Sequence, residues 1–455
     1  MDKSPSTGGL QRILSVRDLI FYGIVVITPI APVPIYGVGQ EMSRGHLILC
    51  LALAGVAMML TAFSYGRMAT LYPSAGSAYV YVGRGLAASL GFVAGWTMTL
   101  DYVVLPIVAI IQAALAVHRL LPAVPYALAS AVFVVLITAL NLRGMRTTAR
   151  TNICLLAIMA IVIAAFLISA VRYISALNGL SGLFSLRPFY HADSFELPLI
   201  ATATSFAALT YIGFDGVTTL AEDVSNPARN VPLATVVVCL FTTLFSCILV
   251  YFAQLIVPDY RYFSNIETAF MDVTRQVGGD ILFQGLGIVV ILSSLGAALG
   301  AEVAAARVLL VMGRDNVLPR RFGNLDTATG TPTLNILVIS GSALVGSLFL
   351  SLEHAGELLN FGALLGFMGV NLATLRQFYF LQARDRSHLC SDALIPAAGF
   401  VFCLAIWLTL PLLAKLIGGA WLLLGLSYYA VWRRRLKNQN LESPGKSTSP
   451  TTRSV

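Results

Sequence analysis

Charged side chains are scarce in this sequence of 455 residues. Asp, Glu, Lys and Arg make up 11% of the chain, whereas hydrophobic residues make up 57% and the mean hydropathy is +0.82. Soluble globular domains carry about 25% charged residues. The composition therefore excludes an ordinary soluble domain and indicates an integral membrane protein.

Motifs for several kinds of chemistry are also missing. No Gly-rich phosphate-binding loop of the Walker type occurs, so ATP is not expected to be the energy source. The six cysteines form no Cys-x-x-Cys pair, and the five histidines show no ligand spacing. No apolar stretch carries a histidine in its middle that could serve a nucleophile, and no repeated selectivity filter suggests a channel. We therefore expect neither an enzyme nor a cofactor, metal site or disulfide framework.

What the sequence has in abundance is long apolar stretches. About 20 apolar residues cross a bilayer core, and twelve such stretches centre near residues 30, 57, 101, 131, 161, 207, 244, 295, 341, 367, 404 and 423. The first one follows Arg12, Arg17 and Asp18 and has no small-residue cleavage site after it, so it does not resemble a removable signal peptide. The sequence predicts an all-α protein with twelve transmembrane helices, between residues 18 and 433.

The distribution of Lys and Arg predicts the orientation. Most of the 29 Lys and Arg residues fall in the segments that are cytoplasmic if the N-terminus is inside. Residues 1–17 are then a cytoplasmic segment, and residues 434–455 are a polar cytoplasmic tail that we expect to be disordered. The sequence pI of about 9.2 reflects this topology and attraction to anionic membrane lipid, so no nucleic-acid partner is expected.

Two of the apolar stretches are interrupted. The first contains "ITPIAPVPIYGVG" at residues 27–39, with prolines at 29, 32 and 34, and the sixth contains "TYIGFDGVTTLAEDVSNP". An interrupted helix is tolerated in a membrane only where protein or a water-filled cavity covers its free backbone groups. Paired interruptions in corresponding helices indicate a transporter binding site. We expect two inverted five-helix repeats, about residues 18–172 and 197–380, with two extra helices at about 393–433.

Several motifs resemble those of the amino acid-polyamine-organocation permeases. They are "YPSAGSAYVYV", "GFDGVTTLAEDVSNPARNVP" and "RVLLVMGRDNVLP", and the likeness spans nearly the whole chain. Together with "GWTMTLDYVVLPI" and "LLNFGALLGF", they are most similar to the bacterial putrescine importers. The resemblance implies an inverted-repeat fold, alternating access, and import across the inner membrane coupled to an ion gradient, usually protons.

The first break bears on the substrate. Free N–H groups at the start of the outer half-helix would ordinarily hold a substrate carboxylate. Amino acid permeases of this family have a Gly/Ser-rich segment there, whereas this chain has Ile30, Ala31 and Pro32 followed by Val33 and Pro34. Prolines lack the N–H donor, so the carboxylate site is weakened, although the N–H groups of the other three residues remain. This departure favours an amine that has no carboxylate.

Acidic residues inside the membrane cost free energy to bury, so their presence indicates a function. Asp101 interrupts a stretch without other charges from 85 to 117, and the neighbouring Tyr102 offers cation–π or hydrogen-bond contact with an amine. The Asp-Tyr pair also matches the putrescine-importer pattern. The alternative interpretation is that Asp101 bonds a neighbouring backbone and Tyr102 only packs.

The second break contributes further candidates. Substrate contacts are expected from Gly213, Phe214 and Asp215 there and from Thr28, Ile30 and Ala31 at the first break. The Asp215 carboxylate is either a substrate or proton contact or simply a helix N-cap. The Phe214 ring either closes over the substrate or only packs.

Four other charged residues are candidates for gating or coupling. Glu222 and Asp223 lie about 10 to 12 Å cytoplasmic of Asp215, and they would form an inner gate with Arg229 or simply a solvated helix end. Glu302, five residues before Arg307, would carry a coupling proton or pair with an arginine.

The coupling ion is expected to be a proton rather than sodium. Ser293 and Ser294 could offer hydroxyls to sodium, but small polar residues also join helices, as do the glycine pairs Gly91 with Gly95 and Gly296 with Gly300. The sequence thus predicts a secondary transporter of a small organic amine such as putrescine. The alternatives are an amino acid permease for cationic or neutral amino acids, an exchanger, and a sensor related to permeases that has lost transport.

Overall fold

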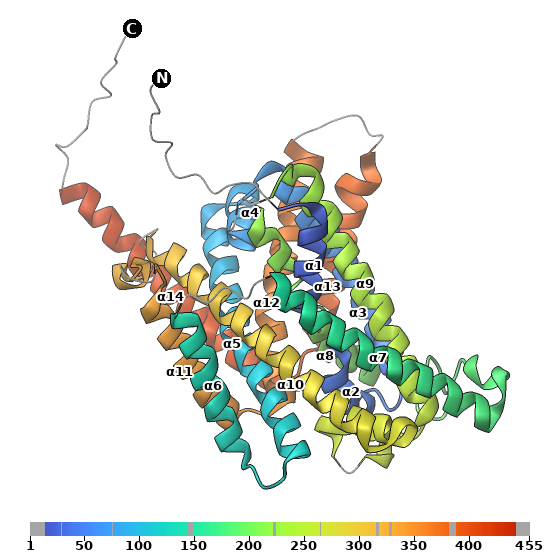
Figure 1. Ribbon diagram of the computed structural model, residues 1–455. Coiled ribbons are helices and arrows are strands. Elements are labelled where there is room, and N and C mark those ends of the chain that lie inside the picture. Colours follow the sequence, from blue (N-terminus) through green and yellow to red (C-terminus); the bar gives the residue numbers. More distant parts are fainter. Residues whose placement is uncertain are drawn as a thin grey trace, which may run out of the picture.

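The computed structural model of the protein is a bundle of helices (Figure 1). It describes residues 14–28, 30–74, 76–143, 149–221, 224–263, 265–314, 318–326, 330–381 and 388–442. Within these ranges the chain forms no strand, and its β-type pairing is one isolated bridge between Leu14 and Val224. The all-α architecture expected from the apolar stretches is therefore confirmed for this part of the chain.

The α-helices are α1 (Val16–Ile27), α2 (Pro32–Met42), α3 (Leu47–Leu71), α4 (Ser77–Gly85), α5 (Ala88–Leu120), α6 (Tyr126–Leu142), α7 (Ala149–Asn178), α8 (Leu197–Ala207), α9 (Pro227–Ile256), α10 (Ala269–Arg314), α11 (Thr333–Phe349), α12 (Leu352–Leu375), α13 (Ile395–Thr409) and α14 (Leu412–Glu442). Short 3₁₀ turns are η1 (Leu180–Leu183), η2 (Ala208–Tyr211), η3 (Phe214–Leu220), η4 (Tyr260–Tyr262), η5 (Ile266–Thr268) and η6 (Arg320–Gly323). The segments η7 (Arg376–Leu381) and η9 (Cys390–Leu394) are π-helical.

Nine helical segments in the described ranges are long and apolar enough to cross a membrane. They are Leu47–Leu71, Ala88–Leu120, Leu156–Asn178, Leu197–Leu220, Pro227–Ile256, Ile266–Arg314, Leu352–Leu381, Cys390–Thr409 and Leu412–Arg433. Two further apolar helices, Tyr126–Leu142 and Thr333–Phe349, are shorter. The first predicted stretch falls on α1 and α2, which have 12 and 11 residues.

The first helix is interrupted between α1 and α2. Thr28, which ends α1, has φ +62°, and its N–H still bonds the Ile24 carbonyl at 3.0 Å. α2 begins at Pro32, where a proline is tolerated because the first N–H groups of a helix have no partner within it. Pro29 lies outside the described residues, while Pro32 and Pro34 are buried in α2.

The sixth apolar stretch is also irregular. α8 ends at Ala207, after which the chain continues through η2 and η3 as tighter turns rather than as an α-helix. Gly213 between them has φ +110°, a left-handed conformation that residues with a Cβ adopt only with strain. This glycine redirects the chain just before Phe214 and Asp215.

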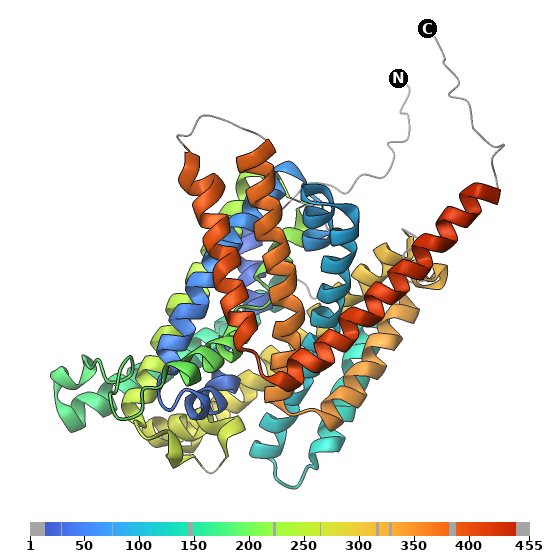
Figure 2. The same ribbon diagram turned by 180° about the vertical axis from the view of Figure 1, so that it is seen from behind.

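α5 is the central helix of the bundle. It packs along α10 and α12, and its apolar window is 72% buried, whereas that of α14 is 17% buried at the edge of the bundle. Figure 2 shows α14, in red, crossing the outside of the other helices. The close contact of α12 with α5 depends on Gly362, because a Cβ there would lie 2.5 Å from the Thr97 carbonyl oxygen.

Candidate functional site

Two buried carboxylates lie together in the middle of the bundle. Asp101 on α5 and Asp215 on η3 are each 1% exposed, and the two side chains interact electrostatically. No ion pair is formed by either of them within the described ranges. Two like charges without a counter-charge are costly inside a membrane protein, so the arrangement is suited to a cationic ligand.

Tyr102 joins α5 to the second break. Its hydroxyl donates a hydrogen bond of 3.0 Å to Asp215 Oδ2. The cap of η3 is Gly213, so Asp215 lies in the first turn and not at the N-cap position. The Thr218 hydroxyl bonds the Asp215 main-chain carbonyl at 2.6 Å. The structure thus brings together Asp101, Tyr102 and Asp215 as one group, which we call the acidic cluster.

Aromatic rings surround the acidic cluster. Phe214 is fully buried, with ring centroids 5.0 Å from Phe367 on α12 and 5.5 Å from Tyr65 on α3. The Tyr65 ring also lies 5.9 Å from the ring of Tyr81 on α4, and Tyr65 interacts electrostatically with both carboxylates. Sequence reasoning missed Tyr65 and Tyr81, since a tyrosine in an apolar helix has no local signal beyond the motif "YPSAGSAYVYV", which contains Tyr81.

The N–H groups at the first break are mostly engaged. The Ala31 N–H donates to the Thr28 carbonyl at 3.0 Å, and the Val33 N–H donates to the Ile30 carbonyl at 2.8 Å. The two prolines that follow have no N–H to offer. Of the three donors that sequence analysis left for a carboxylate, two are therefore used by the turn that starts α2. Ile30 itself is buried, at 1% exposure.

Glu302 on α10 lies in a separate buried network. Asn141 Nδ2 donates to its carboxylate at 2.5 Å, and the Ser340 hydroxyl donates to the other oxygen. Its neighbours are thus neutral donors from α6 and α11, and Arg307 forms no ion pair with it.

Of the three residues predicted to form an inner gate, the structure describes only Arg229. Arg229 is exposed at the start of α9 and has no ion-pair partner within the described ranges. Glu222 and Asp223 lie outside the described residues. Ser225 donates from its N–H and its hydroxyl to the Leu14 carbonyl, each at 2.9 Å, which ties the residues just before α1 to those just before α9.

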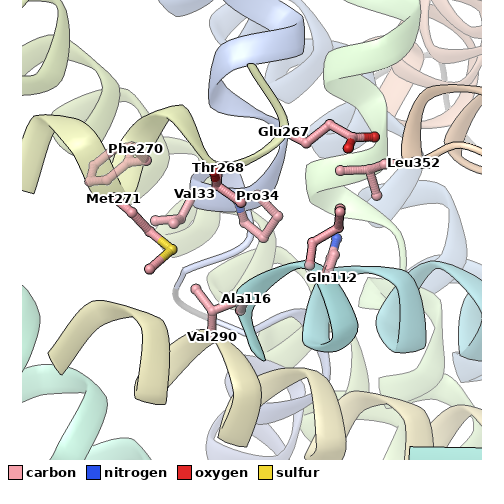
Figure 3. A pocket seen from close by; sticks show the side chains of 11 residues that line it. Val33, Pro34, Gln112, Ala116, Glu267, Thr268, Phe270, Met271, Val290 and Leu352 are labelled. Atoms are coloured by element: carbon pink, nitrogen blue, oxygen red, sulfur yellow. The ribbon is translucent and has the colours of Figure 1, made fainter. Parts of the chain in front are cut away.

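A small cavity lies beside the prolines of α2. Its volume is about 20 Å³, room for one water molecule. Figure 3 shows Val33 and Pro34 on one side of it and Gln112 of α5, Glu267 of η5 and Leu352 of α12 around it. Along α5, Gln112 is eleven residues from Asp101, or about 16 Å at 1.5 Å per residue. The cavity is therefore separate from the acidic cluster.

The broken helices and the buried acidic cluster define a membrane transporter of the permease type. A family model for amino acid permeases matches residues 24–430. The chain belongs to this amino acid permease family, whose members carry solutes rather than catalyse reactions, and it is a multi-pass membrane protein.

Several curated proteins are similar over nearly their whole length. The low-affinity putrescine importer PlaP of Escherichia coli (strain K12) is 30% identical over 94% of this chain and 95% of its own. A methylthioribose transporter of Bacillus subtilis (strain 168) is 28% identical over 94% of each chain. The branched-chain amino acid permease BcaP of Lactococcus lactis subsp. cremoris is 24% identical over 94% of this chain and 96% of its own. Their names cover putrescine, methylthioribose and branched-chain amino acids, so the relatives of this chain are transporters of several kinds of small solute.

Proposed function

We propose that this protein imports a small organic amine, putrescine or a related polyamine, across the inner membrane as a secondary active transporter. The observation that carries the proposal is the acidic cluster, with two buried carboxylates and no basic partner among the described residues. An ammonium group neutralises a carboxylate there, whereas a substrate carboxylate adds a third negative charge. The named activity of PlaP supports the same substrate class.

The first break supports an amine in a second way. A carboxylate needs free N–H donors, and Ala31 and Val33 have already used theirs. In this proposal the main-chain groups around Thr28, Ile30 and Ala31 face the substrate as part of the wall of its site, while the ammonium is held at Asp101 and Asp215. Gly213 gives the second break its turn, and Phe214 closes over the bound substrate.

The proposed architecture follows the alternating-access pattern. Twelve membrane-spanning helices arise if the α1–α2 pair and the short α6 and α11 each cross once in addition to the nine longer segments. Residues of about 18–172 and 197–380 then form two inverted five-helix repeats, followed by two extra helices at about 393–433. Both termini lie in the cytoplasm, where residues 1–17 and 434–455 belong. Import is coupled to protons, with Glu222, Asp223, Arg229 and Glu302 as candidates for gating or coupling.

An amino acid permease is the second candidate, because BcaP and other relatives carry that name. The two functions are separated by uptake of radiolabelled putrescine into proteoliposomes with an imposed pH gradient. Ornithine, which is putrescine with an added carboxylate, is the competitor. Uptake that ornithine barely inhibits supports the amine importer. Equal inhibition by ornithine, or uptake of amino acids only, supports the amino acid permease or an amine and amino acid exchanger.

Two variants test the site itself. Asp101→Asn removes one buried charge and Tyr102→Ala removes the hydroxyl that bonds Asp215. Both are expected to lose most putrescine uptake while reaching the membrane in normal amounts. Asp272→Asn is the matched control. The Asp272 carboxylate forms an ion pair of 2.6 Å with Arg119, away from the acidic cluster, so this variant should retain uptake. Normal uptake in both site variants would refute the assignment.

A further inference from the structure

One histidine ring holds the loop between α7 and α8, residues 179–196, against the short turn between α2 and α3. His46 directly precedes α3 and is buried, at 0% exposure. Its Nδ1 lies 3.0 Å from the Ser43 carbonyl oxygen, and its Nε2 lies 3.1 Å from the main-chain nitrogen of His191. The Phe195 ring packs edge to face on it, with centroids 5.4 Å apart. Both ring nitrogens are therefore engaged by main-chain groups, one from the turn and one from the loop.

These two contacts fix the protonation state of the His46 ring. A carbonyl oxygen only accepts, so Nδ1 carries a hydrogen and donates it to Ser43. A main-chain N–H only donates, so Nε2 accepts from His191 with its lone pair. Neutral imidazole has one donor and one acceptor nitrogen, whereas both nitrogens of the charged form are donors. The loop and the turn therefore make this contact only while His46 is uncharged.

The charged groups around the turn pair with one another rather than with the ring. Arg44 pairs with Glu196, and the His191 ring lies 3.8 Å from Asp193. Other charged or titratable residues of the turn, the loop and the neighbouring η4 are Glu41, Arg187, Tyr190, Asp259, Tyr260 and Arg261. In the described part of the chain no carboxylate bonds the His46 ring, so nothing there compensates a proton on Nε2.

The contact also joins the two interrupted helices. Ser43 ends α2, where its N–H and its hydroxyl bond the Gly39 carbonyl at 3.0 and 2.6 Å. The loop that contains His191 ends at Glu196, directly before α8, and α8 leads into the second break. The His46 ring therefore links the half-helix that follows the first break to the half-helix that precedes the second.

We propose that His46 is a pH-sensitive link between these two half-helices. Histidine is the side chain that gains a proton between about pH 5 and 8. A second proton on the ring places an Nε2–H against the His191 N–H, and two buried donors that face each other have no hydrogen bond. The link holds at the alkaline end of this range and weakens at the acid end. This pH dependence arises outside the acidic cluster and does not depend on which solute is carried.

The same loop contains a second main-chain bond that serves as an internal reference. The Ser185 N–H donates to the Tyr251 hydroxyl at 2.8 Å, and this hydroxyl lies 2.9 Å from the Leu183 carbonyl oxygen. A phenol oxygen accepts equally well between about pH 5 and 8, because phenols titrate near pH 10. The two N–H groups thus report on one loop, one bonded to a ring that titrates in this range and the other not.

The test is amide hydrogen exchange on the purified full-length protein at about pH 5 and about pH 8, with rates corrected for the intrinsic pH dependence of exchange. Protection of the His191 N–H is expected to fall about tenfold at the lower pH, because one hydrogen bond is lost. Protection of the Ser185 N–H is expected to change by less than about twofold. Equal protection of the His191 N–H at both pH values would overturn the proposal.

Two variants identify the group that titrates. His46→Gln offers an oxygen acceptor that does not titrate, so protection of the N–H at position 191 should be the same at both pH values, whatever its level. His191→Gln keeps the main-chain donor and removes only the ring near Asp193, so it is the matched control and should lose protection at low pH as wild type does. If His46→Gln keeps the pH dependence, or if His191→Gln abolishes it, another group titrates and the proposal is wrong.

Discussion

Replacing Gly362 by alanine should separate α12 from α5 at the level of Asp101. A Cβ at position 362 would lie 2.5 Å from the Thr97 carbonyl oxygen and 3.2 Å from the Asp101 nitrogen. Both atoms are backbone, so no side chain can rotate away, and the helices must move apart by roughly half an ångström or more. Overpacking of this kind costs about 1 to 3 kcal/mol. The alanine returns about 0.5 to 1 kcal/mol through its better helix propensity, which leaves a net loss of up to about 2.5 kcal/mol.

The consequence for function should be larger than the consequence for stability. Asp101 is carried by the part of α5 that must shift, whereas Asp215 is carried by η3. The Gly362→Ala variant is therefore expected to unfold a few degrees below wild type and to lose putrescine uptake to a greater extent than this shift explains. Thermal unfolding in detergent and uptake into proteoliposomes measure the two effects.

Gly341→Ala on α11 is the control for the same change. No atom lies within 4 Å of the Cβ that it adds, so this variant should be as stable as wild type or up to about 1 kcal/mol more stable. If Gly362→Ala matched Gly341→Ala in stability and in uptake, α12 would not depend on this contact and the reasoning would be refuted.

Three further changes have defined outcomes. Gly213→Ala forces a Cβ onto a residue at φ +110°, costs about 1 to 2 kcal/mol, and should slow uptake more than Gly216→Ala, whose backbone is not left-handed. Glu302 accepts hydrogen bonds from Asn141 and Ser340, one on each carboxylate oxygen. Glu302→Gln replaces one of these oxygens by an NH₂ donor, so it should lower the free energy of unfolding by about 1 to 3 kcal/mol and leave the affinity for putrescine unchanged. Trp421→Phe removes the bond of 3.0 Å from its indole N–H to the Trp96 carbonyl, which should cost about 1 kcal/mol and expose α14 to proteolysis before the rest of the bundle.

The two helix interruptions and the buried acidic residues could be predicted from the sequence, because each departs from a local pattern. Proline beyond the first turn of a helix kinks or breaks it; α1 ends at Ile27, and α2 begins at Pro32 with Pro34 in its first turn. An acid in an uncharged stretch stands out in the same way, which is why Asp101 could be chosen. The proximity of Asp101 to Asp215 could not be predicted from local sequence, since 113 positions separate Tyr102 and Asp215, whose side chains form the hydrogen bond.

Spacing rules were only partly informative about packing. Four-residue glycine pairs predict close helix contact, and Gly91 does meet Gly83 of α4, where a Cβ would lie 2.5 Å from the Gly83 Cα. Gly300 follows the same spacing, yet no atom of a neighbouring helix lies within 4 Å of a Cβ placed there. A small residue permits a close approach, but only the path of the neighbouring helix decides whether one occurs.

Glu302 shows the same limit for polar residues. Along the helix, Arg307 is the nearest opposite charge, and sequence reasoning could offer only that partner or a proton. The structure supplies Asn141 and Ser340 from two other helices. Tertiary contacts thus determine what a buried carboxylate bonds, and no pattern within α10 contains that information.

The acidic cluster also connects substrate binding with coupling. A closed site that holds Asp101 and Asp215 without a cation is penalised by their mutual repulsion. An ammonium group removes the penalty when the carrier is loaded, and a proton on one carboxylate removes the mutual repulsion when no amine is bound. A carrier that can return without an amine performs net uptake, whereas one that returns only with a second amine performs exchange. Asp101→Asn removes this repulsion, because only one carboxylate remains, so we expect the variant to return empty more readily and its residual uptake to depend less on the pH gradient. Measuring putrescine counterflow and gradient-driven uptake side by side tests this link, and an unchanged ratio of the two rates in the variant would contradict it.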